Sequence, residues 1–334
     1  MRLNALFCDH MVLQADRPIR IFGEGCGIVR VRIDGLTAEK ECSTNLWTVQ
    51  LDAHPYGGPY DLSVELNGER RTIRDVYFGD ILLIAGQSNL QLKLFETNTP
   101  QALYESNPML RLFTLRRPEE GESFFPEDGW LPAQAETVGK WTGIGYLAGN
   151  MLSKQSGHAV GLIACYQGAS MIQSWLPAGI LEGTECDLAS EPRSGMLREP
   201  QYLAWNHDGL LYREMFRKIV PLSVKAVIWY QGESNSNPPD NTVAIYSGML
   251  KRLLSSWRAD LEDPALPFLI IQLPNLKGAN VAGWQAVQEA QSAVCDADDR
   301  AVCIPCADIC EDNHIHPPTK LPLAERIAEQ LYRL

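Results

Sequence analysis

The sequence has no long apolar run and no excess of basic residues. No stretch of its 334 residues approaches the roughly 20 consecutive apolar residues that span a bilayer. Lys and Arg total 29 against 41 Asp and Glu, which gives a formal net charge of -12. Because phosphate groups are bound by concentrated Lys and Arg, this composition argues against nucleic-acid and anionic-membrane partners. We expect a globular protein whose ligand is neutral or is guided by local charge.

The N-terminus lacks the continuous apolar centre of a signal peptide. Its short apolar runs are interrupted by Asn4, Asp9 and His10. As written, the chain is therefore expected to stay in the cytoplasm. If a leader has been removed from it, the protein is expected to be secreted.

The nine cysteines are odd in number and scattered, unlike the framework of a small disulfide-rich protein. We expect most of them to be reduced and buried. Cys303, Cys306 and Cys310 lie close to His314 and His316, and Cys and His at short spacing can bind zinc. A second Cys-x-x-Cys pair does not follow, so we favour an apolar strand leading into a His loop, with no metal.

Two kinds of pattern divide the chain near residue 75. Residues 1–75 alternate apolar and polar residues between Gly-rich or Asn-Gly turns, which is typical of antiparallel hairpins. From residue 76 on, continuous apolar runs alternate with helix-like stretches, and such runs are typical of strands buried on both faces of a parallel sheet. The runs are 80–86, 159–165, 225–232 and 267–274. We therefore predict a small, sandwich-like all-β module over 1–75 and an α/β domain over 76–334.

Helices are expected in five stretches of the second part. They are 142–157, 211–222, 246–261, 284–294 and 323–334. Residues 95–140 and 176–205 are rich in Pro, Gly and charge with little periodicity, so we expect long surface loops there. In layered α/β sheets, ligands bind outside the carboxyl ends of the strands, and the residues that follow each strand matter most.

Three of these strand ends carry residues suited to acyl transfer. Ser88 follows the run 80–86, where a strand would hold a nucleophile at the edge of the sheet. Gly168 can present a backbone N–H to a tetrahedral oxyanion, and Asn235 can supply an amide N–H. Each is also explained by a turn or a helix cap, and the Gly-x-Ser-x-Gly elbow of lipase-type hydrolases is absent. Their placement at successive strand ends is what favours a serine esterase.

A Ser nucleophile also needs a base, and His is the usual choice because its pKa lies near neutrality. Of the six histidines, His314 and His316 lie in a loop before the last helix, where a base can fold back over the sheet edge. We favour His316, because Pro317 and Pro318 restrict the backbone beside it.

Four short blocks resemble those of the SGNH hydrolases, which are named for Ser, Gly, Asn and His. They are "GQSN" (86–89), "CYQGAS" (165–170), "WYQGESN" (229–235) and "IHP" (315–317). More closely, the chain resembles the sialate O-acetylesterase branch of the carbohydrate esterases, over nearly its whole length. The resemblance implies a three-layer α/β/α domain with a central parallel sheet, preceded by a β module. It also implies deacetylation of a sugar hydroxyl through an acetyl-serine intermediate, without metal or organic cofactor.

Carried over to this sequence, the resemblance assigns a role to each block. It implies Ser88 as the nucleophile and His316 as the general base. The oxyanion hole would comprise the N–H groups of Ser88 and Gly168 and the Asn235 amide. Residues beside the blocks are expected to contact the substrate, and these are Gln87, Gln167, Gln231 and Glu233.

Two departures from the family pattern affect the site. The family commonly has Gly-Gly where this chain has Gln167-Gly168, which places Gln167 near the oxyanion hole. The family's Asp-Ile-His-Pro begins here with His314, so a histidine replaces the acid expected to orient His316. The alternatives are another acid, with Asp312 as the nearest candidate and Glu311 and Asp308 as weaker ones, or a Ser–His dyad steadied by a backbone carbonyl.

The substrate class stays open between acetylated sialic acids and acetylated plant glycans such as xylan or mannan. A carboxylated sugar would favour a basic pocket, although the basic residues of the loops are better explained as ordinary solvated surface. They are Lys93, Arg116, Arg117, Arg193 and Arg198. A catalytically weak glycan-binding protein is the alternative of another class, and no large apolar lid favours a lipase-like enzyme. The sequence carries no signal for the oligomeric state.

Overall fold

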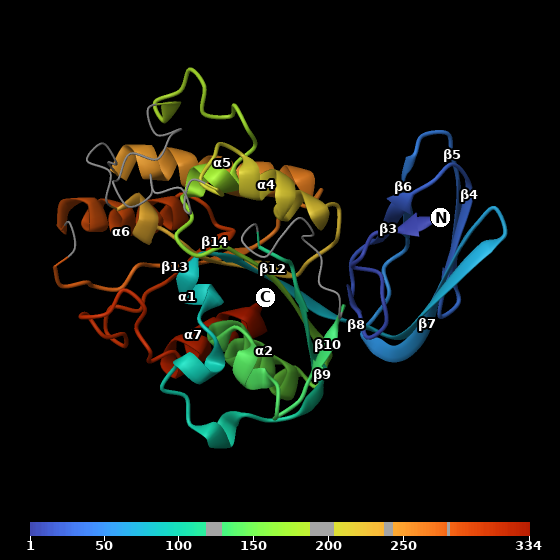
Figure 1. Cartoon of the computed structure of the whole chain (residues 1–334), viewed down its shortest axis with the longest axis horizontal. Coiled ribbons are helices and arrows are strands. Elements are labelled where there is room, and N and C mark those ends of the chain that lie inside the picture. The colour runs from blue at the N-terminus through green and yellow to red at the C-terminus, as the bar shows by residue number, and fades with distance from the viewer. Residues whose placement is uncertain (118–128, 188–203, 237–242, 279–280) are drawn as a thin grey trace.

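The computed structural model describes residues 1–117, 129–187, 204–236, 243–278 and 281–334. Figure 1 shows a module of β-strands at the N-terminal end, beside a larger part in which helices lie on both faces of a sheet. One apolar core runs through both parts, with buried residues from Leu6 to Leu331.

Antiparallel hairpins build the N-terminal module. One sheet contains β1, β3 and β6, and β5, β4, β7 and the first half of β8 pair in a second sheet. The strands are β1 (Arg2–Leu3), β2 (Val12–Gln14), β3 (Ile19–Glu24), β4 (Gly27–Ile33), β5 (Leu36–Cys42), β6 (Leu46–Leu51) and β7 (Gly57–Leu66). Between β7 and β8, Asn67 and Gly68 both have positive φ (52° and 87°), the conformation for which Asn-Gly is favoured in tight hairpins.

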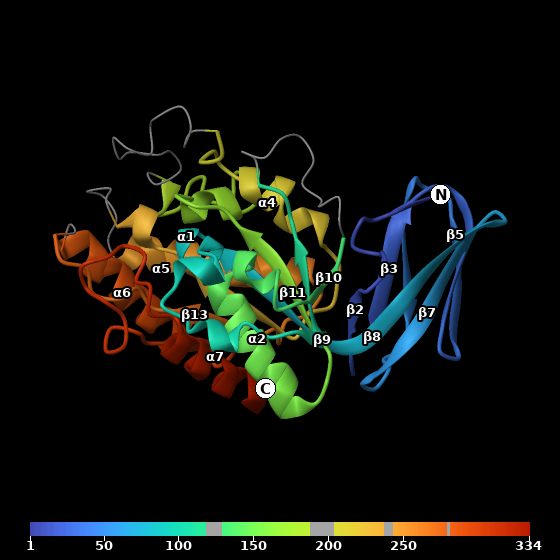
Figure 2. The same ribbon diagram turned by 60° about the horizontal axis from the view of Figure 1, so that its bottom comes forward.

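Strand β8 (Glu69–Gly86) belongs to both parts of the molecule, as Figure 2 shows. Its first half pairs with β7, and its second half pairs in parallel with β11 (Val160–Tyr166) and β12 (Ala226–Tyr230). The boundary predicted between residues 75 and 76 therefore falls inside one continuous strand. The β module is attached to the central sheet by this strand rather than by a linker.

The central sheet has the order β10-β9-β11-β8-β12-β13-β14, with β10 antiparallel at one edge and the other strands parallel. Every residue of β11, β12 and β13 is buried, as expected for strands covered on both faces. The remaining strands are β9 (Asn107–Thr114), β10 (Leu131–Ala133), β13 (Phe268–Ile271) and β14 (Ala301–Ile304).

Helices α2 and α7 pack together on one face of this sheet, and α4, α5 and α6 lie on the other (Figure 1). The predicted fold class, a three-layer α/β/α domain after a small β module, is confirmed. The helices are α1 (Ser88–Gln91), α2 (Gly143–Ser156), α4 (Leu210–Glu214), α5 (Val243–Asp260), α6 (Val281–Asp296) and α7 (Leu321–Arg333). Over the described residues, none of the helices is both long and apolar enough to cross a bilayer.

Strands β9 and β10 correct the expectation of long surface loops over 95–140. Pro108 and Arg111 interrupt the apolar run of β9, which hid the strand in the sequence. Arg111 is only 2% exposed, and its guanidinium donates to the backbone oxygens of His10 (2.8 Å) and Asp75 (2.6 Å). A buried cation is therefore satisfied by groups from the β module.

The helix predicted over 211–222 is also shorter than expected. Helix α4 ends at Glu214, and a 3₁₀ turn, η8 (Phe216–Lys218), follows it. Pro221 has no N–H to donate and disfavours helical backbone at the residue before it, so the helical stretch ends here.

All nine cysteines are free, as expected, but only four of them are buried, so the expectation that most of them are buried is wrong. In the cluster near the His loop, Cys306 donates its thiol to the backbone oxygen of Gln272 at 3.1 Å. Within the described ranges, no group of three or more His, Cys, Asp or Glu side chains is placed to hold a metal ion.

Candidate active site

The carboxyl ends of β8, β11 and β12 meet at one edge of the central sheet. Gly86, the last residue of β8, is level with Tyr166 and Tyr230. Backbone bonds continue this alignment, from Gln87 N–H to Tyr230 O (2.9 Å) and from Gln167 N–H to Gly86 O (3.0 Å). The φ of Gly86 is +142°, and a Cβ there would lie 2.1 Å from Tyr230 O, so only glycine fits. Three of the predicted blocks therefore start from neighbouring positions.

Ser88 and His316, the predicted nucleophile and base, are hydrogen-bonded. Ser88 opens α1, directly after β8, and His316 belongs to the loop before α7. The distance from Ser88 Oγ to His316 Nε2 is 2.7 Å. A neutral imidazole at this distance can take the hydroxyl proton, so the pair has the geometry of a nucleophile and its general base.

The backbone on both sides of His316 is anchored to the segment that follows β8. Asn89 Nδ2 donates to Ile315 O at 3.0 Å, and Asn98 N–H donates to Pro318 O at 3.0 Å. These bonds fix the loop just before and just after His316. The His316 ring is therefore positioned through its own main chain.

None of the acids predicted to orient His316 bonds to it in the described part of the chain. Each has another partner, and the pairs are Asp312 with Lys277, Glu311 with Thr319, and Asp308 with Arg326. His314, which replaces the acid of the family pattern, is exposed. Among the predicted alternatives, this geometry favours a Ser–His dyad.

Charges of both signs act on His316. Partial burial of the ring is the main cause that lowers its pKa, and the positive charge of Lys320 lowers it further. The negative charge of Glu96, in the 3₁₀ turn η1 (Leu94–Glu96), acts in the opposite direction. A lowered pKa keeps the imidazole neutral, and able to accept a proton, to lower pH than usual.

A buried polar network lies beside the Ser–His pair. Lys320, 1% exposed, donates from Nζ to Asn89 Oδ1 at 2.7 Å. Asn89 Nδ2 donates to Glu233 Oε1 at 2.6 Å and also to Ile315 O. Burial lowers the pKa of Lys320 and raises that of Glu233. Asn89 thus joins the helix that begins at Ser88, the end of β12 and the loop that contains His316.

Two of the predicted oxyanion donors lie next to each other. Ser88 N–H is the first of α1 and has no hydrogen-bond partner among the described residues. Gly168 N–H donates to Gln91 Oε1 at 2.8 Å. A Cβ on Gly168 would lie 3.7 Å from Ser88 Cβ, so this backbone borders the Ser88 side chain.

The third predicted donor, Asn235, lies deeper. It is 1% exposed, its Nδ2 donates to Gln173 Oε1 at 3.0 Å, and its Oδ1 accepts from Gln231 Nε2 at 2.7 Å. These amides hold the 3₁₀ turn η9 (Glu233–Asn235) against η5 (Ile172–Trp175). Asn235 therefore stabilises the end of β12, and its role as a direct donor stays a prediction.

The residues predicted to contact substrate are at most 3% exposed, and they are Gln87, Gln167, Gln231 and Glu233. Their side chains are hydrogen-bonded within the segments that follow the strands, and their contact with a substrate stays a prediction. Of the basic candidates, Lys93 is exposed and Arg116 and Arg117 are partly buried. Arg193 and Arg198 lie outside the described residues.

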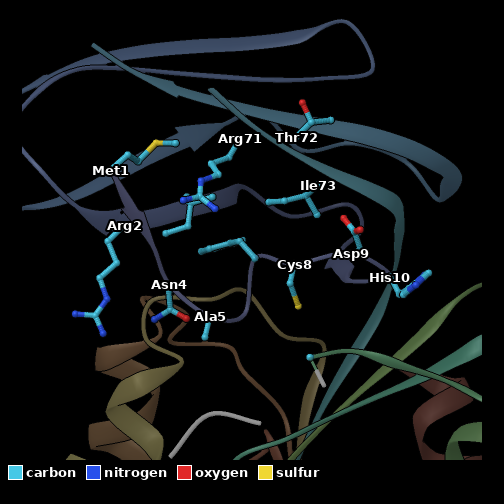
Figure 3. Close-up of a pocket in the computed structure, with 13 residues that line it drawn as sticks. Met1, Arg2, Asn4, Ala5, Cys8, Asp9, His10, Arg71, Thr72 and Ile73 are labelled. Carbon is cyan, nitrogen blue, oxygen red and sulfur yellow. The ribbon is translucent and has the colours of Figure 1, made fainter. Parts of the chain in front are cut away.

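A cavity of about 690 Å³ lies in the β module and is lined mainly by residues 1–10 and 71–73 (Figure 3). Its charged groups have partners: the N-terminal amine bonds Glu69 Oε2 at 2.8 Å, and His10 Nδ1 bonds Asp75 Oδ2 at 2.6 Å. None of the predicted site residues lines it. The Ser88–His316 pair is therefore the better candidate for an active site.

Sequence reasoning assigned no role to Asn89, Gln91 or Lys320. Asn89 is part of the first matched block, and Lys320 lies three positions after the last one. Their closeness to these blocks in the sequence was therefore the one sign that they contribute to the site. A lysine before an amphipathic helix is usually solvated, and nothing in the sequence indicates that Lys320 is buried.

The chain is similar to known carbohydrate esterases. The family described as "Carbohydrate esterase, sialic acid-specific acetylesterase" matches residues 78–333. Human sialate O-acetylesterase is 25% identical over 255 residues, which cover 69% of this chain and 47% of the human protein. The mouse sialate O-acetylesterase is 25% identical over 304 residues, which cover 77% and 56% of the two chains. The chain thus spans about half the length of these relatives.

The fold is also similar to that of a solved structure. The crystal structure of a carbohydrate acetylesterase from Xanthomonas citri has a TM-score of 0.82 and 30% identity to this chain. The match covers 98% of this chain and 73% of that one.

Proposed function

The chain belongs to the sialic acid-specific acetylesterase family of carbohydrate esterases, and from this premise we propose that it removes O-acetyl groups from sugar hydroxyls as a serine esterase. The observation that carries the proposal is the 2.7 Å hydrogen bond between Ser88 Oγ and His316 Nε2. It provides a nucleophile and a base at the edge of the sheet where α/β proteins bind their ligands.

In the first half-reaction, His316 Nε2 accepts the Ser88 hydroxyl proton while Oγ attacks the acetyl carbonyl carbon. The bond from that carbon to the sugar oxygen then breaks, and His316 returns the proton to the sugar oxygen. In the second half-reaction, His316 takes a proton from water, whose oxygen attacks the acetyl-serine carbonyl. The bond to Oγ breaks, the proton returns to Ser88, and acetic acid leaves and ionises.

Negative charge that develops on the acetyl oxygen needs fixed donors. We assign the N–H groups of Ser88 and Gly168 to this role, since both border the nucleophile. Asn235 is retained as the third predicted donor. Its bond to Gln173 holds the end of β12, and that bond also supports the loop around the site.

The names of the relatives guide the choice of substrate. The human and mouse relatives are named for sialate O-acetyl esters, and the Xanthomonas relative is described as a carbohydrate acetylesterase. We propose acetylated sialic acid as the first substrate class and acetylated xylan or mannan oligosaccharides as the second. Lys93 is exposed and follows Ser88 by five positions in the sequence, and its ammonium, 5.7 Å from the centre of the Phe95 ring, is our candidate partner for a sugar carboxylate.

The test is acetate release from O-acetylated sialic acid, acetylated xylo-oligosaccharides and acetylated manno-oligosaccharides. We expect Ser88→Ala and His316→Ala each to lower kcat by roughly 10³-fold or more. Two matched controls remove the same groups away from the pair. They are Ser255→Ala, at an exposed position of α5, and His314→Ala, at an exposed position in the loop that contains His316. We expect both variants to keep the wild-type kcat within about twofold.

Three other outcomes of the acetate assay would change the proposal or refine it. Wild-type acetate release by Ser88→Ala or His316→Ala would reject the mechanism. No acetate from any of the three substrates, together with binding of the same oligosaccharides, would identify a glycan-binding protein instead of an enzyme. The ranking of the three substrates by kcat/KM would decide between sialic acid and plant glycans.

A further inference from the structure

Gln91 binds one of the donors that the substrate needs. It is the last residue of α1, three positions after Ser88, so the two side chains lie on the same side of one helical turn. Its Oε1 accepts the Gly168 N–H at 2.8 Å. The same N–H is assigned above to the oxyanion, so a bound ester and Gln91 compete for a single hydrogen bond.

The amide oxygen of Gln91 resembles the ester carbonyl oxygen with which it would compete for the Gly168 N–H. Oxyanion-hole donors lie roughly 2.7–3.1 Å from the oxygen that they stabilise. The distance from Gly168 N to Gln91 Oε1 falls in this range, and both oxygens belong to a carbonyl group. A Cβ on Gly168 would lie 3.0 Å from Gln91 Oε1 and 3.7 Å from Ser88 Cβ, so the Gln91 amide oxygen and the Ser88 side chain both border this backbone.

The rest of the Gln91 side chain is weakly held. The residue is partly exposed. Its Nε2 has no hydrogen-bond partner among the described residues, so a single polar contact keeps the side chain in place. Rotation toward solvent breaks that one bond and frees the Gly168 N–H.

We propose that Gln91 is an internal ligand of the oxyanion hole, which the acetyl ester must displace, and that it thereby sets the apparent affinity for substrate. This inference rests on the proposed function and adds a residue that none of the matched blocks assigns. In the free protein, the Gln91 amide keeps the Gly168 N–H satisfied. In the complex, the ester carbonyl oxygen replaces Gln91 Oε1.

Two substitutions with opposite expected effects test this proposal, with p-nitrophenyl acetate as the probe. Gln91→Met keeps the length of the side chain and removes the competing oxygen. We expect its KM to fall roughly two- to tenfold with kcat unchanged, and inhibition by sodium acetate to become tighter by a similar factor. Gln91→Glu supplies a charged acceptor that binds the N–H more strongly and repels the oxyanion, so KM should rise and kcat should fall.

A purely structural role for Gln91 predicts a different pattern, in which both variants lose kcat together. That result, or an unchanged KM in Gln91→Met, would overturn the inference. Gln101→Met, at an exposed position in η2 (Gln101–Leu103), is the matched control and should behave as wild type. Ser88→Ala separates the two levels, because retained turnover in that variant would overturn the proposed function itself.

Discussion

Replacement of Lys320 by Met removes the ammonium group that donates to Asn89 in the buried network beside Ser88 and His316. Met has a similar length and no donor, so Asn89 Oδ1 loses its 2.7 Å hydrogen bond. Glu233, joined to Lys320 through Asn89, becomes a buried carboxylate without a nearby cation from this network. Both effects reduce stability, and both act next to the Ser–His pair.

The size of the loss follows from the way the two charges are connected. Loss of a hydrogen bond to a charged group costs about 1.5–3 kcal/mol, and removal of one partner of a buried ion pair costs about 3–5 kcal/mol. Lys320 and Glu233 meet only through Asn89, and Glu233 can bind a proton rather than stay charged. We therefore expect the free energy of unfolding to fall by about 2–4 kcal/mol near pH 7.

The loss is expected to depend on pH. The Lys320 charge now lowers the pKa of Glu233, which burial raises above its ordinary value. Without that charge the folded-state pKa rises further, and a carboxyl group with a raised folded-state pKa costs stability as pH increases. The deficit of Lys320→Met should therefore be larger at about pH 8 than at about pH 5. The same change raises the pKa of His316, so the acidic limb of kcat/KM should move to higher pH.

The assay is urea unfolding followed by tryptophan fluorescence, for Lys320→Met, Glu233→Gln and the double variant, with a pH profile of kcat/KM. We expect the double variant to lose less than the sum of the single losses, by about 1–3 kcal/mol. Lys251→Met, on the exposed side of α5, is the matched control and should change stability by less than about 0.5 kcal/mol. Additive losses, or an acidic limb that moves to lower pH, would refute the reasoning.

Three further predictions concern the surroundings of the site. Glu96→Gln should move the acidic limb of kcat/KM to lower pH, because the Glu96 charge raises the pKa of His316, and high salt should reduce the shift. Asp312→Asn should change kcat by less than about twofold, whereas loss of an orienting carboxylate costs up to roughly 10⁴-fold. Gly86→Ala should destabilise the fold by roughly 3 kcal/mol or more in urea unfolding, because its Cβ would meet a backbone oxygen of β12 at 2.1 Å. Gly183→Ala, whose Cβ has no neighbour within 4 Å, should cost only about 1 kcal/mol, and equal losses would contradict this reading.

The parallel strands could be predicted because burial on both faces leaves an uninterrupted apolar run, as in β11 and β12. Strand β9 broke that rule, since Arg111 sits inside it and its guanidinium is satisfied by Asp75 and stacks over the Tyr77 ring at 4.5 Å. The sequence of a strand also does not show that the strand pairs with different neighbouring strands along its length. The pairing of β8 with the β module and then with the central sheet therefore appeared only in three dimensions.

The same limit explains which site residues could be found. Ser88 and His316 stand in blocks whose residue types indicate their chemistry. Asn89, Gln91 and Lys320 act through hydrogen bonds to groups 144, 77 and 231 positions away, so their roles depend on distances that no local pattern contains.

The replacement of the expected acid by His314 changes what the site requires of His316. A carboxylate beside an imidazole orients the ring and stabilises its protonated form. Here the backbone bonds at Ile315 and Pro318 orient the loop, while burial and the Lys320 charge disfavour the protonated ring. A base with a lowered pKa takes a proton less readily, yet it is unprotonated in more molecules below neutrality. At mildly acidic pH, a larger fraction of molecules therefore has a neutral His316, but each neutral His316 is a weaker base. We expect a modest maximal rate that persists as the pH falls.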